Sequence, residues 1–197
     1  MNFLAHCTLA HPETALVAGG FIGDFVKGPI PDELPEPLRA GIRLHRRVDA
    51  VSNRLPGISE SVRRLDPRLR RAAPVLLDIV ADHCLALRWE IHGHGDLRMF
   101  SALAYDAIGA FEQFLPDHGR KYFRRFRDAD VLSRYGESRT ALRAMTYILK
   151  RLRMAHLVPE LDAIVGTQLP VLMDDFESYF PELRTAVAAW KEENGQQ

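Results

Sequence analysis

The sequence predicts an all-α protein that folds as a single-domain helical bundle. Apolar residues recur at the three- and four-residue spacing of helices along almost the whole chain, and no alternating strand pattern of useful length interrupts them. Neither an internal repeat nor a convincing linker divides the chain, so we expect one domain over residues 1–197. Hydrophobic residues make up 47% of the sequence, which is enough for a sizeable core in a chain of this length.

In the first half of the chain, helical spacing runs between clear breaks. It covers residues 2–10, 13–26, 38–54, 58–65 and 68–91. Pro12 ends the first of these segments, and four prolines within residues 27–37 predict a loop before the third. Gly19, Gly20 and Gly23 lie in the second segment, where we expect them to permit the close approach of another backbone.

The second half of the chain is expected to be helical as well. Helical spacing covers residues 96–115, 119–132, 137–153, 159–179 and 182–191. The glycines of His92-Gly93-His94-Gly95 break the pattern between the two halves. Pro170 should kink or split the helix in which it lies, because proline removes a backbone hydrogen-bond donor.

Charge and cysteine content favour a soluble protein of a reducing compartment. Lys plus Arg and Asp plus Glu balance at 26 each, which predicts no strong attraction to nucleic acid or to a membrane. The N-terminal residues lack the basic leader and long apolar stretch of a signal peptide, and no run is apolar enough to span a membrane. Cys7 and Cys84 have a spacing that fits neither a zinc ribbon nor a disulfide framework. We therefore expect a cytoplasmic protein with neither a nucleic-acid nor a membrane partner.

The most informative segment is the apolar run over residues 72–87, whose only charged side chains are Asp78 and Asp82. The two carboxylates are i,i+4 neighbours on one helix face, and His83 lies about a hundred degrees further round. Carboxylates in apolar surroundings are costly unless a cation or hydrogen bonds compensate them. Because carboxylate and imidazole are suitable metal ligands, a divalent cation would keep both acids ionised.

Four further residues of ligand type occur on the preceding predicted helices: His6, Asp24, His45 and Asp49. Each has a plain alternative. A lone histidine such as His6 is more often a hydrogen-bonded core residue, and Asp24 suits the turn after Gly23. His45 and Asp49 suit an i,i+4 surface pair. Taken together, however, acids and imidazoles on several apolar helices are typical of the internal metal sites of helical bundles.

Two other patterns are weaker metal signals. His92 and His94 are a competing pair, but they lie in a glycine-broken stretch, where we expect exposed loop histidines. The adjacent Asp82-His83 dyad has the reverse order of the His-Asp dyad that is usual in metal phosphohydrolases. Neither pattern predicts a metal site without the residues on the other helices.

Basic residues gather in clusters although the net charge is zero. The first cluster is Arg63, Arg64, Arg68, Arg70 and Arg71, the second is Arg120, Lys121, Arg124, Arg125 and Arg127, and the third is Lys150, Arg151 and Arg153. Such runs are most often solvated helix faces. Clustered cations also create an electropositive side that attracts an acidic partner.

Four motifs follow one another in the first ninety residues and carry a family resemblance. They are Met1-Asn2-Phe3-Leu4-Ala5-His6, Gly23-Asp24-Phe25-Val26-Lys27-Gly28, Gly41-Ile42-Arg43-Leu44-His45-Arg46-Arg47-Val48-Asp49 and Leu77-Asp78-Ile79-Val80-Ala81-Asp82-His83. With these motifs and its length, the chain resembles the bacterial acyl carrier protein phosphodiesterase (acyl carrier protein hydrolase) family. That family is similar to HD-domain phosphohydrolases, so the resemblance implies an HD-domain-like helical fold.

The resemblance also implies an activity, a cofactor and a set of site residues. The activity is that of a phosphoric diester hydrolase of fatty acid metabolism, which removes 4′-phosphopantetheine from holo-acyl carrier protein and leaves apo-acyl carrier protein. The cofactor is a divalent metal, typically Mn²⁺, with Mg²⁺ or Fe²⁺ as alternatives. The implied metal ligands are His6, Asp24, His45, Asp49, Asp82 and His83, and the implied catalytic carboxylates are Asp24, Asp78 and Asp82.

Basic residues complete this hypothesis. Arg46 and Arg47, beside His45, are expected to clamp the substrate phosphate. The first basic cluster is expected to dock the acidic carrier protein. Two other functions remain open from the sequence. One is an HD-like metal phosphohydrolase that acts on a nucleotide or another small phosphodiester. The other is a non-catalytic helical adaptor for acidic proteins.

Overall fold

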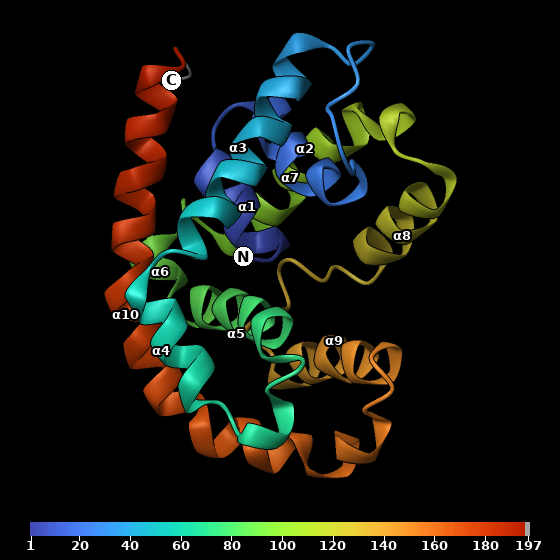
Figure 1. The fold of residues 1–197 in the computed structure, drawn as a ribbon. Coiled ribbons are helices and arrows are strands. Elements are labelled where there is room, and N and C mark those ends of the chain that lie inside the picture. The colour runs from blue at the N-terminus through green and yellow to red at the C-terminus, as the bar shows by residue number, and fades with distance from the viewer. Residues whose placement is uncertain (196–197) are drawn as a thin grey trace.

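The computed structural model describes residues 1–195, which form ten α-helices, four short 3-10 helices and no strand (Figure 1). The predicted all-α class is therefore confirmed for this part of the chain. Residues 196 and 197, the end of the expected domain, lie outside the described residues. The α-helices are α1 Phe3–Ala10, α2 Thr14–Ile22, α3 Glu36–Ser52, α4 Pro56–Arg64, α5 Ala73–Leu87, α6 Trp89–His92, α7 Leu97–Ala110, α8 Asp117–Asp128, α9 Ser138–Arg151 and α10 Leu161–Glu193. The 3-10 helices are η1 Gly23–Phe25, η2 Pro67–Leu69, η3 Glu112–Phe114 and η4 Ala155–Glu160.

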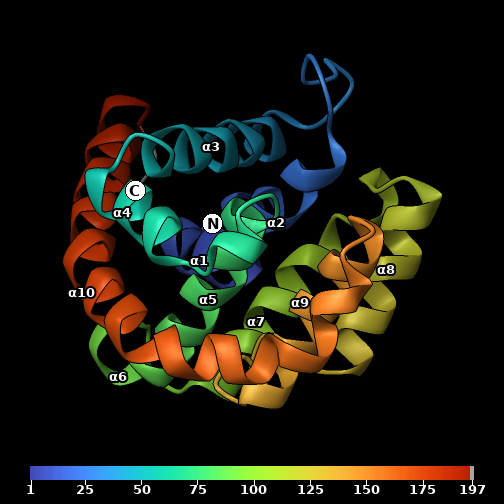
Figure 2. The same cartoon turned by 60° about the horizontal axis from the view of Figure 1, so that its bottom comes forward.

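The two N-terminal helices form the centre of the molecule. All eight residues of α1 are buried, and so is every residue of α2 from Leu16 to Ile22. Helix α1 contacts α2, α3 and α5, and α2 also packs against α7. Figures 1 and 2 show α10 wrapping around one side of this central group. A polar side chain on α1 is therefore held away from bulk water and needs a partner inside the protein.

Glycines bring α2 and α3 into backbone contact. A Cβ atom on Gly19 would lie 2.3 Å from the backbone carbonyl carbon of Gly41, far inside van der Waals distance. A Cβ atom on Gly41 would in turn lie 2.5 Å from the carbonyl oxygen of Ala15. The close approach expected at Gly19 is confirmed, and it carries the polar residues of α3 directly against α2.

The long helix expected over residues 68–91 is three elements, η2, α5 and α6. Pro74 stands in the first turn of α5, where its missing N–H costs no helical hydrogen bond, so α5 begins at Ala73. Arg88, with φ −110° and ψ 26°, ends it. The two aspartates of the apolar run therefore lie on a helix of 15 residues.

Conversely, the helices expected over residues 159–179 and 182–191 are joined in α10, which contains both Pro170 and Pro181. Phe180 and Leu183 are fully buried on either side of Pro181, and this packing stabilises the helix where the proline removes a hydrogen bond. The helix is not split at Pro170 either. It bends along its course, from the lower edge of the molecule to one side (Figures 1 and 2).

Two expectations from the sequence concern the cysteines and the apolar character of the helices. Cys7 and Cys84 are both buried and unpaired, as expected of small core residues. Within residues 1–195, no helix combines the length and the apolar character needed to cross a membrane.

Candidate metal centre

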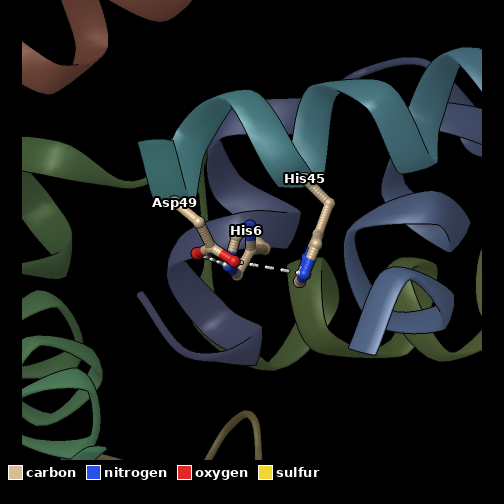
Figure 3. Close-up of side chains that lie close together, drawn as sticks. All are labelled: His6, His45 and Asp49. Atoms are coloured by element: carbon tan, nitrogen blue, oxygen red, sulfur yellow. Dashed lines mark ion pairs between the residues drawn. The ribbon is translucent and has the colours of Figure 1, made fainter. Parts of the chain in front are cut away.

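Three side chains of ligand type meet where α1 packs against α3: His6, His45 and Asp49 (Figure 3). One potential ligand atom of each lies within 4.8 Å of the other two. Both histidines are buried, whereas the Asp49 side chain is 41% exposed, so the group reaches solvent at its carboxylate. His45 and Asp49 are one helical turn apart on α3, which places both side chains on the same face.

Helix α2 holds the ring of His45 in place. Its Nδ1 atom lies 3.0 Å from the carbonyl oxygen of Gly20, and because a carbonyl only accepts, Nδ1 carries the proton. A Cβ atom on Gly23 would fall 2.5 Å from the His45 ring, so glycine at this position leaves room for the imidazole. Nε2 keeps its lone pair and lies 3.4 Å from Oδ2 of Asp49. This is the tautomer that a metal-binding imidazole needs.

The ring of His6 stacks on that of His45, with the ring centroids 4.1 Å apart. Burial, and then the nearby charge of His45, lowers the pKa of His6 to about 4, so this imidazole is neutral at pH 7. Its Nε2 atom lies 3.2 Å from Oδ1 of Asp49, while its buried Nδ1 atom has no hydrogen-bond partner. A histidine with an unpartnered buried nitrogen does not match the alternative of a fully hydrogen-bonded core residue.

Asp49 supplies the negative charge of the group. Burial alone would raise the pKa of Asp49. The hydrogen bond from His6 and the charges of His6, the Met1 amino group and His45 outweigh burial and hold that pKa well below its usual range. Two imidazoles and one ionised carboxylate are a donor set that suits Mn²⁺, Fe²⁺ or Zn²⁺. The residues present therefore fit the divalent metal expected from the sequence.

Asp24 adds a second carboxylate at the edge of the group. It lies in η1, directly after α2, and its Oδ1 atom is 4.0 Å from Nε2 of His45. Burial raises the pKa of Asp24, the charge of His45 opposes this rise, and the charge of Asp49 adds to it. An acid with a raised pKa and a side chain that is 43% exposed is suited to proton transfer with solvent.

Asp82, which the sequence singled out as a metal ligand, has both oxygens occupied by α1. Oδ2 accepts the backbone N–H of Leu4 at 2.8 Å, and Oδ1 accepts that of Ala5 at 2.9 Å. These donors belong to the first turn of α1, and Asn2, the N-cap residue, makes no side-chain hydrogen bond to them. Burial raises the pKa of Asp82 to about 7, and the two N–H groups oppose the rise. The carboxylate is a helix cap supplied by α5.

Asp78 has a cation of its own. Its Oδ1 atom lies 2.9 Å from the amino group of Met1, which also lies 3.5 Å from Oδ1 of Asp49. Burial raises the pKa of Asp78, and the Met1 amino group opposes the rise. The Met1 amino group therefore compensates the charge of Asp78, and two backbone N–H groups compensate that of Asp82. The sequence predicted a metal ion in this compensating role. All of these partners lie at the start of α1, which the spacing of residues 72–87 does not reveal.

His83 is not brought to the group either. Its Nδ1 atom donates to the carbonyl oxygen of Tyr135 at 2.6 Å. The residue lies about 100° round α5 from Asp82 and faces α9, where it borders a small cavity of about 40 Å³ with Ser138 and Leu142. A larger cavity of about 520 Å³ between α9 and α10 includes Ser138 and Leu142 and none of the residues of the metal group.

The expectation of exposed loop histidines is wrong for His92. This residue ends the short helix α6, and only 4% of it is exposed. Its Nε2 atom lies 2.8 Å from Oε2 of Glu177 on α10, because α10 passes over the glycine-broken stretch. His94 is exposed, and its Nε2 atom lies 3.1 Å from the carbonyl oxygen of Thr8. The two histidines have separate partners and form no metal pair.

Of the two arginines expected to bind phosphate, Arg46 is near the site and Arg47 faces away. The Nη2 atom of Arg46 donates to the carbonyl oxygens of Val26 at 3.1 Å and Gly28 at 2.6 Å, in the loop that follows Asp24. Arg47 is exposed and lies about 200° round α3 from His45, on the opposite side of that helix.

The first basic cluster is partly neutralised within the chain. Arg63 pairs with Glu60, Arg64 lies 3.5 Å from Asp175, and Arg68 lies 2.8 Å from Asp66. Arg70 and Arg71 are exposed and form no ion pair with another residue of the described chain. The net positive charge that this surface offers to a partner is smaller than its sequence predicts.

Two groups that border the site were not predicted from the sequence. One is the carbonyl of Gly20, which accepts the hydrogen bond of His45. The glycines of α2 predict that another helix approaches closely, but they do not reveal which side chain bonds to this carbonyl. The other is Tyr122 of α8, whose ring centroid lies 6.0 Å from that of Phe25, the residue after Asp24. Burial, and then the charge of Asp24, raises the pKa of Tyr122 to about 12. Tyr122 is nevertheless 42% exposed.

Comparison with known proteins agrees with the motifs. A model of the family described as acyl carrier protein phosphodiesterase matches residues 1–183. A protein of that name from Enterobacter sp. (strain 638) is 30% identical over 194 residues, which are 93% of this chain and 95% of the relative. One from Escherichia coli O6:H1 is 33% identical over 123 residues, which are 62% of each chain. One from Salmonella dublin is 32% identical over 145 residues, 67% of this chain and 74% of the relative. No solved structure matches the chain.

Proposed function

The chain belongs to the acyl carrier protein phosphodiesterase family, and from that premise we propose its activity. It hydrolyses the phosphodiester that joins 4′-phosphopantetheine to a serine of holo-acyl carrier protein. The products are apo-acyl carrier protein and 4′-phosphopantetheine. The family match over residues 1–183 supports assigning this activity to one domain that spans residues 1–197. The free buried cysteines support a cytoplasmic location.

The observation that carries the chemistry is the group of His6, His45 and Asp49, which would hold the metal. We favour Mn²⁺, with Mg²⁺ or Fe²⁺ as alternatives, because carboxylate oxygen suits Mn²⁺ and Mg²⁺ and imidazole nitrogen suits Fe²⁺. When bound, the ion supplies positive charge for the phosphoryl oxygens and lowers the pKa of a water molecule. The chain contributes two imidazoles, one held by the carbonyl of Gly20 and the other by Asp49 and by stacking on the first ring.

Asp24 is the residue that we assign to proton transfer. Its carboxylate accepts a proton from the water that attacks phosphorus, and it then returns the proton to solvent or to the leaving serine oxygen. Its position 4.0 Å from His45, its partial exposure and its raised pKa support this role. Arg46 orders the loop that follows Asp24, and its remaining guanidinium N–H groups are offered to the substrate phosphate.

Asp82 and Asp78 act through α1 in this proposal. Asp82 caps the first turn of α1, and His6 lies one residue after the last N–H that it accepts. Asp78 lies behind Asp49, and both share the Met1 amino group. Both acids are therefore positioning residues, which set the place of His6 and the charge next to Asp49.

The experiment that tests the proposed function follows the intact mass of the substrate. Purified protein is incubated with holo-acyl carrier protein and Mn²⁺, and mass spectrometry records whether the carrier loses its phosphopantetheine. The proposal predicts complete conversion to the apo form, which stops when the protein is treated with a chelator and resumes when Mn²⁺ is added back. A carrier that keeps its prosthetic group at stoichiometric enzyme would show that the substrate is wrong.

A further inference from the structure

Helices α8 and α9 both carry several exposed basic residues. Five of these residues are Lys121 and Arg125 on α8 and Arg143, Lys150 and Arg151 on α9. Within residues 1–195, none of the five forms an ion pair, whereas the neighbouring Arg120 and Arg124 of α8 pair with Asp117 and Glu112. Helix α9 contains no acidic residue at all. No ion pair within the described residues therefore compensates the charge of these five cations.

Two exposed tyrosines lie among these cations. Tyr122 is 42% exposed and Tyr147 is 62% exposed. Tyr122 is next to Lys121 and three residues before Arg125, while Tyr147 is four residues after Arg143 and three before Lys150, so each tyrosine shares a helix face with cations. We call these two tyrosines and the five unpaired cations the α8–α9 strip. Tyrosine and arginine, which make up most of the strip, are enriched at protein–protein interfaces.

The α8 end of the strip packs against Phe25 and Phe3. The Tyr122 ring lies 6.0 Å from that of Phe25 and 5.9 Å from that of Phe3, centroid to centroid. Phe25 follows Asp24, and Phe3 belongs to the same helix as His6. Besides burial, the charges of Asp24 and Tyr147 both raise the pKa of Tyr122, so each of them lies within electrostatic range of Tyr122. Figures 1 and 2 show α8 and α9 on the same side of the molecule.

We propose that the α8–α9 strip, and not the cluster of Arg63 to Arg71, is the docking surface for an acidic face of the carrier protein. The inference rests on the proposed function, which supplies the carrier as partner. Charge complementarity supports it, since unpaired cations gain most from a partner of opposite sign. So does position, because a surface that starts at Tyr122 lets a prosthetic group on the docked carrier reach Asp24 and the histidines.

The test is a pair of matched charge reversals. One variant carries Lys121→Glu and Arg125→Glu, and the control carries Arg70→Glu and Arg71→Glu, which also replaces two exposed and unpaired cations. We expect the first variant to raise the KM for holo-acyl carrier protein about tenfold at low salt, and the control to leave it within about twofold. The difference should shrink at about 0.5 M salt, because screening weakens interactions between exposed charges.

Two further measurements separate docking from catalysis. Hydrolysis of bis(4-nitrophenyl) phosphate with Mn²⁺ reports on the metal centre alone, and it should be equal in the wild type and in both variants. Calorimetric binding of apo-acyl carrier protein in the presence of a chelator reports on docking alone. It should weaken about tenfold in the Lys121→Glu, Arg125→Glu variant.

Each remaining outcome overturns the inference. If wild-type protein converts the carrier but the Lys121→Glu, Arg125→Glu variant keeps its KM, docking uses another surface and the proposed function stands. If the Arg70→Glu, Arg71→Glu variant alone loses affinity, the first basic cluster is the docking site. If wild-type protein neither converts nor binds the carrier, the proposed function and the docking inference both fail. Tighter binding of a single-stranded oligonucleotide than of the carrier would make the strip a nucleic-acid surface.

Discussion

The imidazole rings of His6 and His45 stack with their centroids 4.1 Å apart, although one comes from α1 and the other from α3. Two protonated rings would repel each other at this distance, and burial keeps His6 neutral. The pair presents nitrogen donors next to the ionised carboxylate of Asp49. A divalent cation would be attracted by the carboxylate and bound by both rings, which makes this contact the core of the proposed metal centre.

Loss of one ring should remove the metal-dependent activity. We expect His45→Ala to reduce Mn²⁺-dependent hydrolysis of bis(4-nitrophenyl) phosphate by about a hundredfold or more, because a direct ligand matters at least as much as the groups that orient it. His156→Ala, which removes an exposed histidine on η4, is the control and should keep wild-type rates. Equal rates in His45→Ala and wild type would place the metal elsewhere.

Room for the His45 ring should be as important as the ring itself. A Cβ atom on Gly23 would lie 2.5 Å from that ring, so Gly23→Ala should displace His45 and raise the Kd for Mn²⁺ about tenfold. A Cβ atom on Gly109 of α7 would meet nothing within 4 Å, so Gly109→Ala should leave the affinity unchanged and stabilise the protein slightly. Isothermal titration of both variants with Mn²⁺ measures the difference. Identical affinities would mean that Gly23 is not needed to seat His45.

Loss of the Asp82 cap on α1 should lower the stability of the protein more than it weakens metal binding. Asp82→Ala leaves the N–H groups of Leu4 and Ala5 buried without an acceptor, and we expect it to lower the free energy of unfolding by about 2–4 kcal/mol. Asp106→Ala, an exposed aspartate on α7, is the control and should change that free energy by less than about 0.5 kcal/mol. Urea unfolding measures both. An Asp82→Ala protein with wild-type stability and no bound Mn²⁺ would instead make Asp82 a ligand.

The buried His6 should make the metal-free protein sensitive to acid. Its pKa is about 4 in the folded protein and 6.5 when unfolded, so its contribution to stability is fully present above pH 6.5 and is lost as the pH falls toward 4. The shift corresponds to about 3 kcal/mol. Because other groups also titrate, the informative quantity is the difference between wild type and His6→Gln in the presence of a chelator. The free energy of unfolding should fall less steeply between pH 6.5 and 4.5 in His6→Gln, and equal slopes would contradict the burial effect.

Local patterns in the sequence were sufficient to predict the all-α class and to include His6, His45 and Asp49 in a larger set of candidate ligands. Periodicity predicts helices because each must bury an apolar face, and the positions of His6, His45 and Asp49 follow from motifs on such helices. The glycines of α2 predict close packing, and α3 does pack there against Gly19. Such features can be predicted from the sequence because each depends on residues that are a few positions apart in the chain.

Contacts between residues that are far apart in the chain could not be predicted from local patterns. Asp82 receives N–H groups from residues 77 and 78 positions before it, so its compensation is visible only in the folded protein. Arg64 is likewise neutralised by Asp175 on α10. The continuous path of α10 through Pro181 depends on burial of the aromatic residues around it. In each case, a tertiary contact determines the outcome, and the local sequence pattern alone predicts a different one.

The central claim is that His6 and His45 both bind the metal, and spectroscopy of bound Mn²⁺ tests it most directly. Pulsed electron paramagnetic resonance of the Mn²⁺-loaded protein with ¹⁵N-labelled histidine detects nitrogen atoms that coordinate the ion. We predict couplings from two histidine nitrogens in wild type, and from one in His6→Gln and one in His45→Gln. Stoichiometrically bound Mn²⁺ with no nitrogen coupling, or with couplings that persist unchanged in both variants, would contradict the claim.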